Sequence, residues 1–435
     1  MNELRRDNII CYDFIYQYVI TNLNKTRVHI HNQSMTDDRI PVTVLSGPLG
    51  AGKTTVLNQI LTADHGFEVA VVVNDMGDVN VDAEHVAQQT DLGADEEIIE
   101  LSNGCICCRL RGDMLDEVGR LADRLEFDYL LVESSGISEP IPVAQTFTMG
   151  FEDADFDPTN TYRLDTMVTV VNAHSIWESF DFGTALTSQQ LQDDSGRVPE
   201  EVLLDQIEFC DVLLLNKCDL VPDDALEEIE AVLERLQPSA DLIRTEFGDI
   251  DPDNILGTGE FDFQRAKASA GWKHELQHDH HHDPREEHGV TSFVYQRDRP
   301  FHPERIASLL TALPDELIRA KGFFWSAGRE DVAMGIDKAG TSVRAGPAGA
   351  WLATLPEAER EQYFAARPGI KDDWDDQWGD RMTRLVFIGR DFESDALIDR
   401  LDECLLTERE LTDNWDTYAD PFEPEERREL ALANE

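Results

Sequence analysis

Gly47-Pro48-Leu49-Gly50-Ala51-Gly52-Lys53-Thr54 is the motif that says most about the fold of this chain. It fits the phosphate-binding loop, or P-loop, in which a lysine and a hydroxyl residue follow two spaced glycines. Glycines let backbone N–H groups turn inward toward an anion, Lys53 neutralises the β and γ phosphates of a nucleotide, and the Thr54 hydroxyl can ligate Mg²⁺. The alternative is a glycine turn that binds nothing. The residues expected to hold a nucleotide are Gly47, Gly50, Ala51, Gly52, Lys53, Thr54 and Thr55.

Short apolar runs alternate with helical stretches on either side of this loop. The P-loop itself lies between an apolar run, 42–45, and a helical run, 55–61. Continuous apolar runs are typical of parallel strands buried on both faces, and their alternation with helices predicts an α/β fold. We expect a doubly wound P-loop domain with a parallel-rich sheet over residues 40–250. Its further strands are expected at 69–73, 98–101, 129–132, 167–171 and 212–215.

Asn216-Lys217-Cys218-Asp219 follows the apolar run 212–215, at the edge where such sheets bind ligands. The Asp219 carboxylate can accept both the ring N–H and the exocyclic amine of guanine, whereas adenine offers no such pair of donors. Asn216 is expected to tie neighbouring loops to the base site. We therefore expect Asn216, Lys217 and Asp219 to bind the nucleotide and to favour GTP over ATP.

Leu130-Leu131-Val132-Glu133-Ser134-Ser135-Gly136 ends another strand with an acid and a glycine. Glu133 is expected beside the metal and the γ-phosphate, where it holds a Mg²⁺-bound water or the attacking water, and Gly136 can offer its N–H to that phosphate. The expected catalytic residues are therefore Lys53, Thr54 and Glu133, with Thr54 and Glu133 also at the Mg²⁺. The alternative is a simple turn at the end of a strand.

Gly104-Cys105-Ile106-Cys107-Cys108 places three thiols within four residues. Three side chains so close in sequence cannot all face inward as core packing, and in a reducing compartment they indicate soft ligands for Zn²⁺ or a similar ion. We expect Cys105, Cys107 and Cys108 to bind a metal, with a structural or redox role as the alternative. The other cysteines considered, Cys11, Cys210 and Cys404, have apolar or helical surroundings in the sequence and are expected to fill cores.

Residues 251–289 lose apolar periodicity and gain Gly, Asp and His, which predicts a His-rich acidic linker. Six of the chain's 12 histidines fall between 274 and 288. Such a composition collects metal ions weakly, because no packed scaffold fixes a geometry; the alternative is a charged spacer. The histidines expected to take part are His278, His280, His281 and His282.

Strand and helix patterns resume after the linker and predict a smaller α+β domain over 290–408. The acidic end, 409–435, is expected to fray. Residues 1–39 form a leader of different composition, because the charges of 1–34 sum to +1 while the rest of the chain carries −52. Either translation starts at Met35 or the segment is a poorly ordered leader with local helix.

The chain has 435 residues with 37 Lys and Arg against 88 Asp and Glu, a formal net charge of −51. This charge repels a polyphosphate backbone, so nucleic-acid binding is not expected. With 41% apolar residues, the acid is interpreted as a coat over folded domains, which suits a salt-loving source whose cytoplasm screens it. The chain has seven cysteines, an odd number, and three of them are clustered, which indicates reduced thiols and a cytoplasmic protein. No apolar run is long enough to predict a membrane span.

Together these motifs resemble the CobW-like GTPases, the metallochaperone and metal-insertase branch of the SIMIBI class of P-loop proteins. The resemblance covers about residues 40–406, and its most specific part is the cysteine run. The second domain, with Arg319 to Trp325 and Trp378 to Gly389, looks like the C-terminal domain of that family. The other marks are 47–55, 74–77, 133–136, and Gln206-Ile207-Glu208 ahead of 216–219.

The resemblance implies a protein that binds GTP and Mg²⁺, hydrolyses GTP slowly, and carries a transition metal, zinc or cobalt, to a client metalloprotein. The metal would sit at Cys107 and Cys108 with Cys105 nearby, and the nucleotide state would set its hold or release. A nucleotide-dependent homo-oligomer is a further expectation. Asp75 stands where many members carry Glu, so the resemblance leaves the fourth metal ligand open.

Two other functions remain compatible with these residues. One is a metal buffer whose nucleotide site is vestigial, which predicts zinc binding that is indifferent to GTP. The other is a small-molecule kinase on the same fold, which needs an acceptor pocket and gives the cysteines no purpose. We favour the GTPase metallochaperone, with catalysis by the electrostatic effect of Lys53, Mg²⁺ and loop N–H groups.

Overall fold

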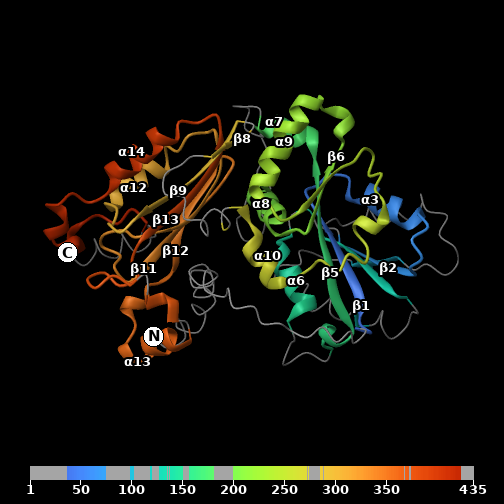
Figure 1. Ribbon diagram of the computed structural model, residues 1–435, viewed down its shortest axis with the longest axis horizontal. Helices are drawn as coiled ribbons and strands as arrows, with labels where there is room; N and C mark the ends of the chain where they lie inside the picture. The colour runs from blue at the N-terminus through green and yellow to red at the C-terminus, as the bar shows by residue number, and fades with distance from the viewer. Residues whose placement is uncertain are drawn as a thin grey trace, which may run out of the picture. The chain divides into compact units, whose positions relative to one another are not determined.

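The computed structural model of the protein divides into two compact units, one spanning His31–Gly271 and the other including Trp272–Glu435. Both are drawn in Figure 1. The residues that the structure describes are 37–74, 98–101, 118–119, 127–134, 136, 138–149, 156–180, 199–271, 273, 285–287, 289–366, 368–371 and 374–422.

The first unit is built on a sheet of seven strands in the order β3-β2-β4-β1-β5-β6-β7. Every neighbouring pair in it is parallel. The strand order reverses beside the central β1, which is where open sheets of this class bind ligands, at the carboxyl ends of the strands. The strands are β1 (Ile40–Ser46), β2 (Val69–Asn74), β3 (Ile98–Leu101), β4 (Tyr129–Glu133), β5 (Tyr162–Asn172), β6 (Val212–Asn216) and β7 (Asp241–Arg244).

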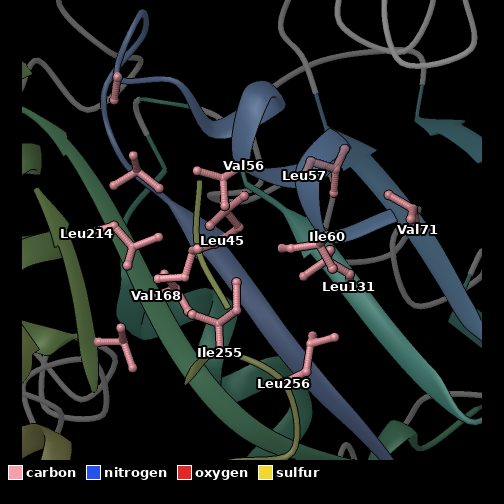
Figure 2. Packing of buried hydrophobic residues seen from close by; sticks show 14 of the residues in the cluster. Leu45, Val56, Leu57, Ile60, Val71, Leu131, Val168, Leu214, Ile255 and Leu256 are labelled. Carbon is pink, nitrogen blue, oxygen red and sulfur yellow. The ribbon is translucent and has the colours of Figure 1, made fainter. Parts of the chain in front are cut away.

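Both faces of this sheet are covered, as expected for a doubly wound domain. On one face Val42, Val44 and Val132 pack with Val143 and Phe147 of helix α6 (Pro140–Thr148). On the other face a second apolar cluster forms around helix α3 (Lys53–Thr62) (Figure 2), in which the alternation along β1 and β4 places Leu45 and Leu131. Other α-helices in the described part of the unit are α7 (Ala173–Phe180), α8 (Pro199–Phe209), α9 (Asp223–Leu236) and α10 (Phe263–Ser269).

Residues 251–271 belong to the first unit, so the prediction of a linker there is wrong. Ile255 and Leu256 are buried in the cluster around α3 (Figure 2), and Ala266 of α10 is buried on the other face of the sheet. The segment lacks the periodicity of a strand or a long helix, because its few apolar residues fill gaps in a core made by other elements.

The second unit holds a six-stranded sheet in the order β12-β11-β10-β13-β9-β8, in which all pairs are antiparallel. Helices α12 (Pro303–Leu310) and α14 (Ser394–Cys404) contribute Ile306, Leu310 and Leu401 to its main apolar cluster. The strands are β8 (Arg285–Glu287), β9 (Val290–Arg297), β10 (Leu317–Phe324), β11 (Val332–Ala339), β12 (Ser342–Ala350) and β13 (Thr383–Arg390), and one further helix is α13 (Glu357–Ala366). The strand β8 lies in the expected linker, so that expectation also fails at 285–287.

The acidic end of the chain is packed as far as residue 422, contrary to the expected frayed tail from 409. Trp415 is buried, and its indole N–H donates to the Glu410 carbonyl at 2.9 Å. Arg329 binds Asp420 at 2.7 Å. Charge alone suggested a solvated tail, but a buried tryptophan and ion pairs to the second unit hold it in place.

Several expectations fall on residues outside those that the structure describes. They are the leader 1–36 with Cys11, Asp75, the cysteine run 104–108 with Cys105, Cys107 and Cys108, the histidines His278, His280, His281 and His282, and residues 423–435. Among the helices within the described ranges, none combines the length and the apolar character needed to span a bilayer.

Candidate functional site

The P-loop joins the carboxyl end of β1 to the amino end of α3 through three glycines with left-handed backbones. Their φ angles are 135° at Gly47, 78° at Gly50 and 106° at Gly52. A β-carbon at Gly47 would lie 2.1 Å from the Val170 carbonyl oxygen, and one at Gly52 would lie 2.3 Å from Nδ2 of Asn216. A β-carbon at Gly50 would meet no atom within 4 Å. The loop therefore needs glycine for close packing at two positions and leaves open space at the third.

The amino end of α3 is suited to an anion. Its N-cap is Gly52, no side chain caps it, and its first turn holds no acidic residue. Unsatisfied N–H groups and the helix dipole both favour negative charge at such an end. Lys53 begins the helix with its side chain buried, and its ammonium donates to the carbonyl oxygens of Gly47 at 3.0 Å and Pro48 at 3.4 Å. The lysine thus lies folded over the loop whose anion it would neutralise.

Asn216, at the end of β6, connects two loops. Its side-chain amide donates to the Ala51 carbonyl at 2.9 Å, and its oxygen accepts the Gly248 N–H at 3.1 Å. The side chain is 1% exposed, so breaking either bond would leave a buried polar group unpaired. A single asparagine therefore fixes the P-loop against the 245–249 loop that follows β7.

Lys217 and Asp219 follow Asn216 on the same edge. Lys217 has a left-handed φ of 62°, and its ammonium donates to the Gly50 carbonyl at 2.8 Å. Asp219 lies exposed on the short helix η3 (Cys218–Leu220), where its carboxylate has no hydrogen-bond partner within the described part of the chain. The carboxylate is thus open to a ligand in solution.

Glu133 and Gly136 approach the P-loop from the end of β4. Thr54 Oγ1 lies 3.5 Å from Oε1 of Glu133, whose side chain is buried. A β-carbon on Gly136 would be 2.8 Å from the Leu49 nitrogen, so the backbones of the two loops are in contact. The expected site residues of 47–55, Glu133, Gly136, Asn216 and Lys217 are therefore brought together, with Asp219 on the same edge.

The three described cysteines are unsuited to metal binding. Each thiol donates to a backbone carbonyl, from Cys210 to Ile207, from Cys218 to Leu215 and from Cys404 to Arg400. Burial raises the pKa of each, in the case of Cys404 to about 11. Metal ligation requires the thiolate. No group of three or more His, Cys, Asp or Glu side chains placed to hold a metal occurs within the described ranges.

The sequence argument missed the loop 245–249. Its Thr245 N–H donates to the Leu215 carbonyl at 2.8 Å, which carries the pairing of β6 and β7 into the loop. The strand β7 is four residues long with polar ends, so periodicity could not reveal it. A Phe-Gly pair just after the helix 226–236 and a short apolar run was the available signal.

Comparison with known proteins gives consistent matches over both units. Residues 41–244 match the CobW/HypB/UreG nucleotide-binding domain, and residues 290–405 match the C-terminal domain of the cobalamin synthesis protein cobW. The chain is 39% identical over 426 residues to "Zinc-regulated GTPase metalloprotein activator 1" of Dictyostelium discoideum, a match that covers 94% of this chain and 89% of the relative. It is 27% identical over 361 residues to "Zinc chaperone YjiA" of Escherichia coli, covering 80% and 94% of the two chains.

Among solved structures, the Zn(II)-bound YjiA GTPase from E. coli aligns with 85% of this chain and 99% of its own, at 22% identity and a TM-score of 0.39.

Proposed function

The chain belongs to the CobW family of P-loop GTPases, and on that premise we propose that it is a GTP-hydrolysing metallochaperone that carries zinc or cobalt to a client metalloprotein. The observation that carries the proposal is a P-loop with the expected glycine conformations, held in place by the Asn216 side chain. The same chain contains the cysteine motif from Gly104 to Cys108. Relatives named as a zinc chaperone and a zinc-regulated activator favour zinc.

The P-loop residues would bind the phosphates of GTP. Lys53 would exchange its bonds to the Gly47 and Pro48 carbonyls for phosphate oxygens, and the N–H groups at the start of α3 would face the same anion. Lys217 donates to the Gly50 carbonyl and Asn216 donates to the Ala51 carbonyl, so two side chains hold the loop in place. Little rearrangement is then needed before a nucleotide binds, which favours affinity.

Thr54 and Glu133 fit Mg²⁺, because both present oxygen atoms, the ligands that this ion prefers, and the two oxygens lie 3.5 Å apart. When bound, the ion supplies positive charge to the phosphates. Glu133, buried at the end of β4, would hold a water on the metal or on the attacking path, and Gly136 would donate its N–H toward the γ-phosphate. Catalysis would thus be electrostatic, with Lys53 and the loop N–H groups around the transferring phosphoryl group.

Asp219 would select guanine over adenine. Its exposed carboxylate can accept two N–H donors from one edge of guanine, whereas adenine lacks that pair. Asn216 places this segment relative to the P-loop through the bonds to Ala51 and Gly248. The base-binding segment and the phosphate-binding loop would then be connected through the buried side chain of Asn216.

Cys105, Cys107 and Cys108 would bind the metal, because three thiols within four residues suit a soft metal ion. Cys210, Cys218 and Cys404 fit that role less well, since burial raises their pKa values and each thiol donates to a backbone carbonyl. In the sequence the three clustered thiols come after β3, and Asp75 comes directly after β2. Both strands belong to the parallel sheet of β1, so their carboxyl ends lie at the edge where β1 leads into the P-loop. We expect nucleotide binding and metal binding to be coupled by about 1 to 3 kcal/mol, a 5- to 150-fold change in metal affinity. The His278 to His282 segment would gather ions for this site.

A client metalloprotein and a nucleotide-dependent homo-oligomer are the partners that this function implies. We expect the protein in the cytoplasm, where clustered thiols stay reduced.

Metal titrations of the GTP-loaded and GDP-loaded protein test the proposal. We expect Zn²⁺ and Co²⁺ affinities that differ at least 5-fold between the two states, and a loss of the tight site in Cys107→Ser. The matched control is Cys404→Ala, which removes a buried thiol of the second unit and should leave both titrations as they are. Lys53→Ala should abolish GTP hydrolysis and, with it, any cycling between the two affinities.

Other outcomes of the same titrations assign a different function. Identical zinc affinity in every nucleotide state would mean a metal buffer with a vestigial nucleotide site. Transfer of the γ-phosphate to a small molecule rather than to water would mean a kinase.

A further inference from the structure

Five large apolar side chains are exposed in the described part of the chain. One of them belongs to the P-loop and two belong to the neighbouring loops after β6 and β7. Leu49 is 83% exposed, Leu220 54% and Phe247 69%; the other two, Ile141 and Met149, lie on α6 and at its end. Leu49 follows β1, Leu220 follows β6 and Phe247 follows β7, so all three stand at the carboxyl edge of the sheet. In a chain of net charge −51, such residues at a ligand-binding edge indicate a surface that a ligand covers.

Phe247 combines this exposure with an unfavourable backbone. Its φ is 55°, in the left-handed region where the β-carbon crowds the following carbonyl. Gly248 next to it has a φ of 69°, which glycine adopts without that crowding. A large aromatic residue that is held in a strained conformation and is 69% exposed gains little from burial in this state. Strain of this kind is typical of residues placed for function.

The loop fixes the position of Phe247. Gly248 donates to Oδ1 of Asn216 at 3.1 Å, and Thr245 Oγ1 donates to the Asp249 carbonyl at 2.8 Å. A β-carbon on Gly248 would lie 2.9 Å from the Val56 nitrogen, so the loop backbone also contacts α3. The loop that carries Phe247 is therefore held both by β6, which leads to Asp219, and by α3, which follows the P-loop.

A purine needs both a partner for its edge and a partner for its face. Asp219 supplies acceptors for the edge, but a carboxylate contributes nothing to the face of the ring. Within the described loops that follow β1, β4 and β6 and the 245–249 loop after β7, Phe247 is the one aromatic residue. Any nucleobase can stack on an aromatic ring, because every base has a π-face. We propose that Phe247 is the aromatic wall of the base site and stacks on the guanine ring, an inference that rests on the proposed GTP binding.

The test compares nucleotide affinity, measured by calorimetry, for Phe247→Gly, Phe247→Ala and Phe247→Tyr. We expect GDP and GTP to bind about tenfold more weakly to the Gly and Ala variants and almost normally to the Tyr variant, because stacking needs a ring rather than that particular residue. The Gly variant also relieves the strained backbone, so its thermal midpoint should stay at or above that of the wild type. Met149→Ala, at the end of α6, is the matched control and should bind like the wild type.

Base selectivity separates this inference from the proposed function. Loss of stacking lowers the affinity for guanine and adenine nucleotides by the same factor, whereas Asp219→Asn removes the preference for guanine. Unchanged GDP affinity in both Phe247→Gly and Phe247→Ala would overturn the stacking role and leave GTP binding intact. A wild-type protein that binds no guanine nucleotide would overturn the proposed function and this inference with it.

Discussion

Gly47 and Gly50 both have a left-handed backbone but differ in the space around them. Substitutions at the two positions therefore distinguish the effect of a steric clash from that of backbone strain. In Gly47→Ala the new β-carbon would lie 2.1 Å from the Val170 carbonyl oxygen, inside a central strand that cannot move away. We expect its free energy of unfolding to fall by about 3 to 5 kcal/mol. Gly50→Ala meets only its own strained φ of 78°, and should lose about 1 to 2 kcal/mol. Urea unfolding measures both.

The affinity for GDP tests the Gly50 position separately from stability. The open space beside Gly50 is where the proposed function places phosphate, so Gly50→Ala should remain folded yet bind GDP more weakly. Normal GDP binding by a stable Gly50→Ala variant would contradict the position assigned to the phosphates.

Asp211 gives a pH dependence of stability whose sign follows from its surroundings. Burial raises its pKa from 3.8 to about 6, although the Met167 N–H at 2.8 Å and Arg265 lower it again. The folded state thus binds this proton more tightly than the unfolded chain, so the residue's contribution is complete below the unfolded pKa and is lost as the pH rises through about 6.

Asp211→Asn removes that titration. Relative to the variant, the wild type should lose about 1 kcal/mol of unfolding free energy between pH 5 and pH 8. Urea unfolding of both proteins at each pH gives the difference, from which the titration of the other acidic groups cancels. A difference that is constant with pH, or that grows in favour of the wild type at pH 8, would mean that the carboxylate is ionised throughout.

Tyr129 of β4 connects the segment 255–259 to the sheet. The tyrosine hydroxyl accepts the Gly257 N–H at 2.9 Å and lies 2.8 Å from Thr43 Oγ1 and 3.1 Å from Asp165 Oδ2. Tyr129→Phe leaves these buried groups short of a partner, so we expect a loss of about 2 to 4 kcal/mol in unfolding free energy. Thermal unfolding followed by circular dichroism provides the measurement.

Tyr162→Phe is the control for this substitution. Tyr162 is also fully buried in the same unit, and its hydroxyl donates to the Val118 carbonyl at 2.8 Å. Its hydroxyl bond goes to a residue outside the 255–259 segment, so the loss in unfolding free energy should be smaller. Equal losses in the two variants would show that the hydroxyl network of Tyr129 has no special role in holding the segment.

Regular elements of the first unit were predictable because their apolar residues repeat with the period of a strand or a helix. The run 98–101 coincides with β3, and 212–215 lies within β6. β5 starts earlier than the expected 167, at Tyr162, since Arg163 and Asp165 interrupt the apolar run. These two polar residues fit into the strand because they form contacts with partners in the folded chain. One such contact is the hydrogen bond from Arg163 Nη1 to Asp165 Oδ1 at 2.5 Å.

Irregular segments were not predictable, because tertiary contacts alone decide them. Ile255 and Leu256 lie in a stretch rich in Gly and Asp, yet they fill the cluster around α3. Trp415 lies in an acidic tail, yet it packs on Trp325 with ring centroids 6.0 Å apart. The P-loop, Glu133 and Asn216 were found from motifs, whereas Phe247 and the loop that carries it have no motif and became visible through backbone conformation and exposure.

For the whole molecule, the net charge of −51 sets a repulsion that every folded unit must withstand. Compaction brings the carboxylates closer together than in the unfolded chain, so repulsion destabilises the folded state. Salt screens it, because the Debye length falls from about 10 Å at 0.1 M to about 3 Å at 1 M. The stability of this chain should therefore depend on ionic strength far more than that of a protein near neutrality.

We expect the thermal midpoint to rise by at least about 5 °C between 0.1 and 1 M KCl, with most of the gain below about 0.5 M, where the Debye length changes fastest. Preferential exclusion of a solute from the protein surface also stabilises folded proteins, but it grows steadily with concentration and does not saturate. Sucrose at the same concentrations is thus the control and should lack the early steep phase. A midpoint that is flat below 0.5 M KCl and rises only at higher salt would show that the acidic coat is already neutralised by local ion pairs, and the interpretation of the charge as an adaptation to a salt-rich cytoplasm would fail.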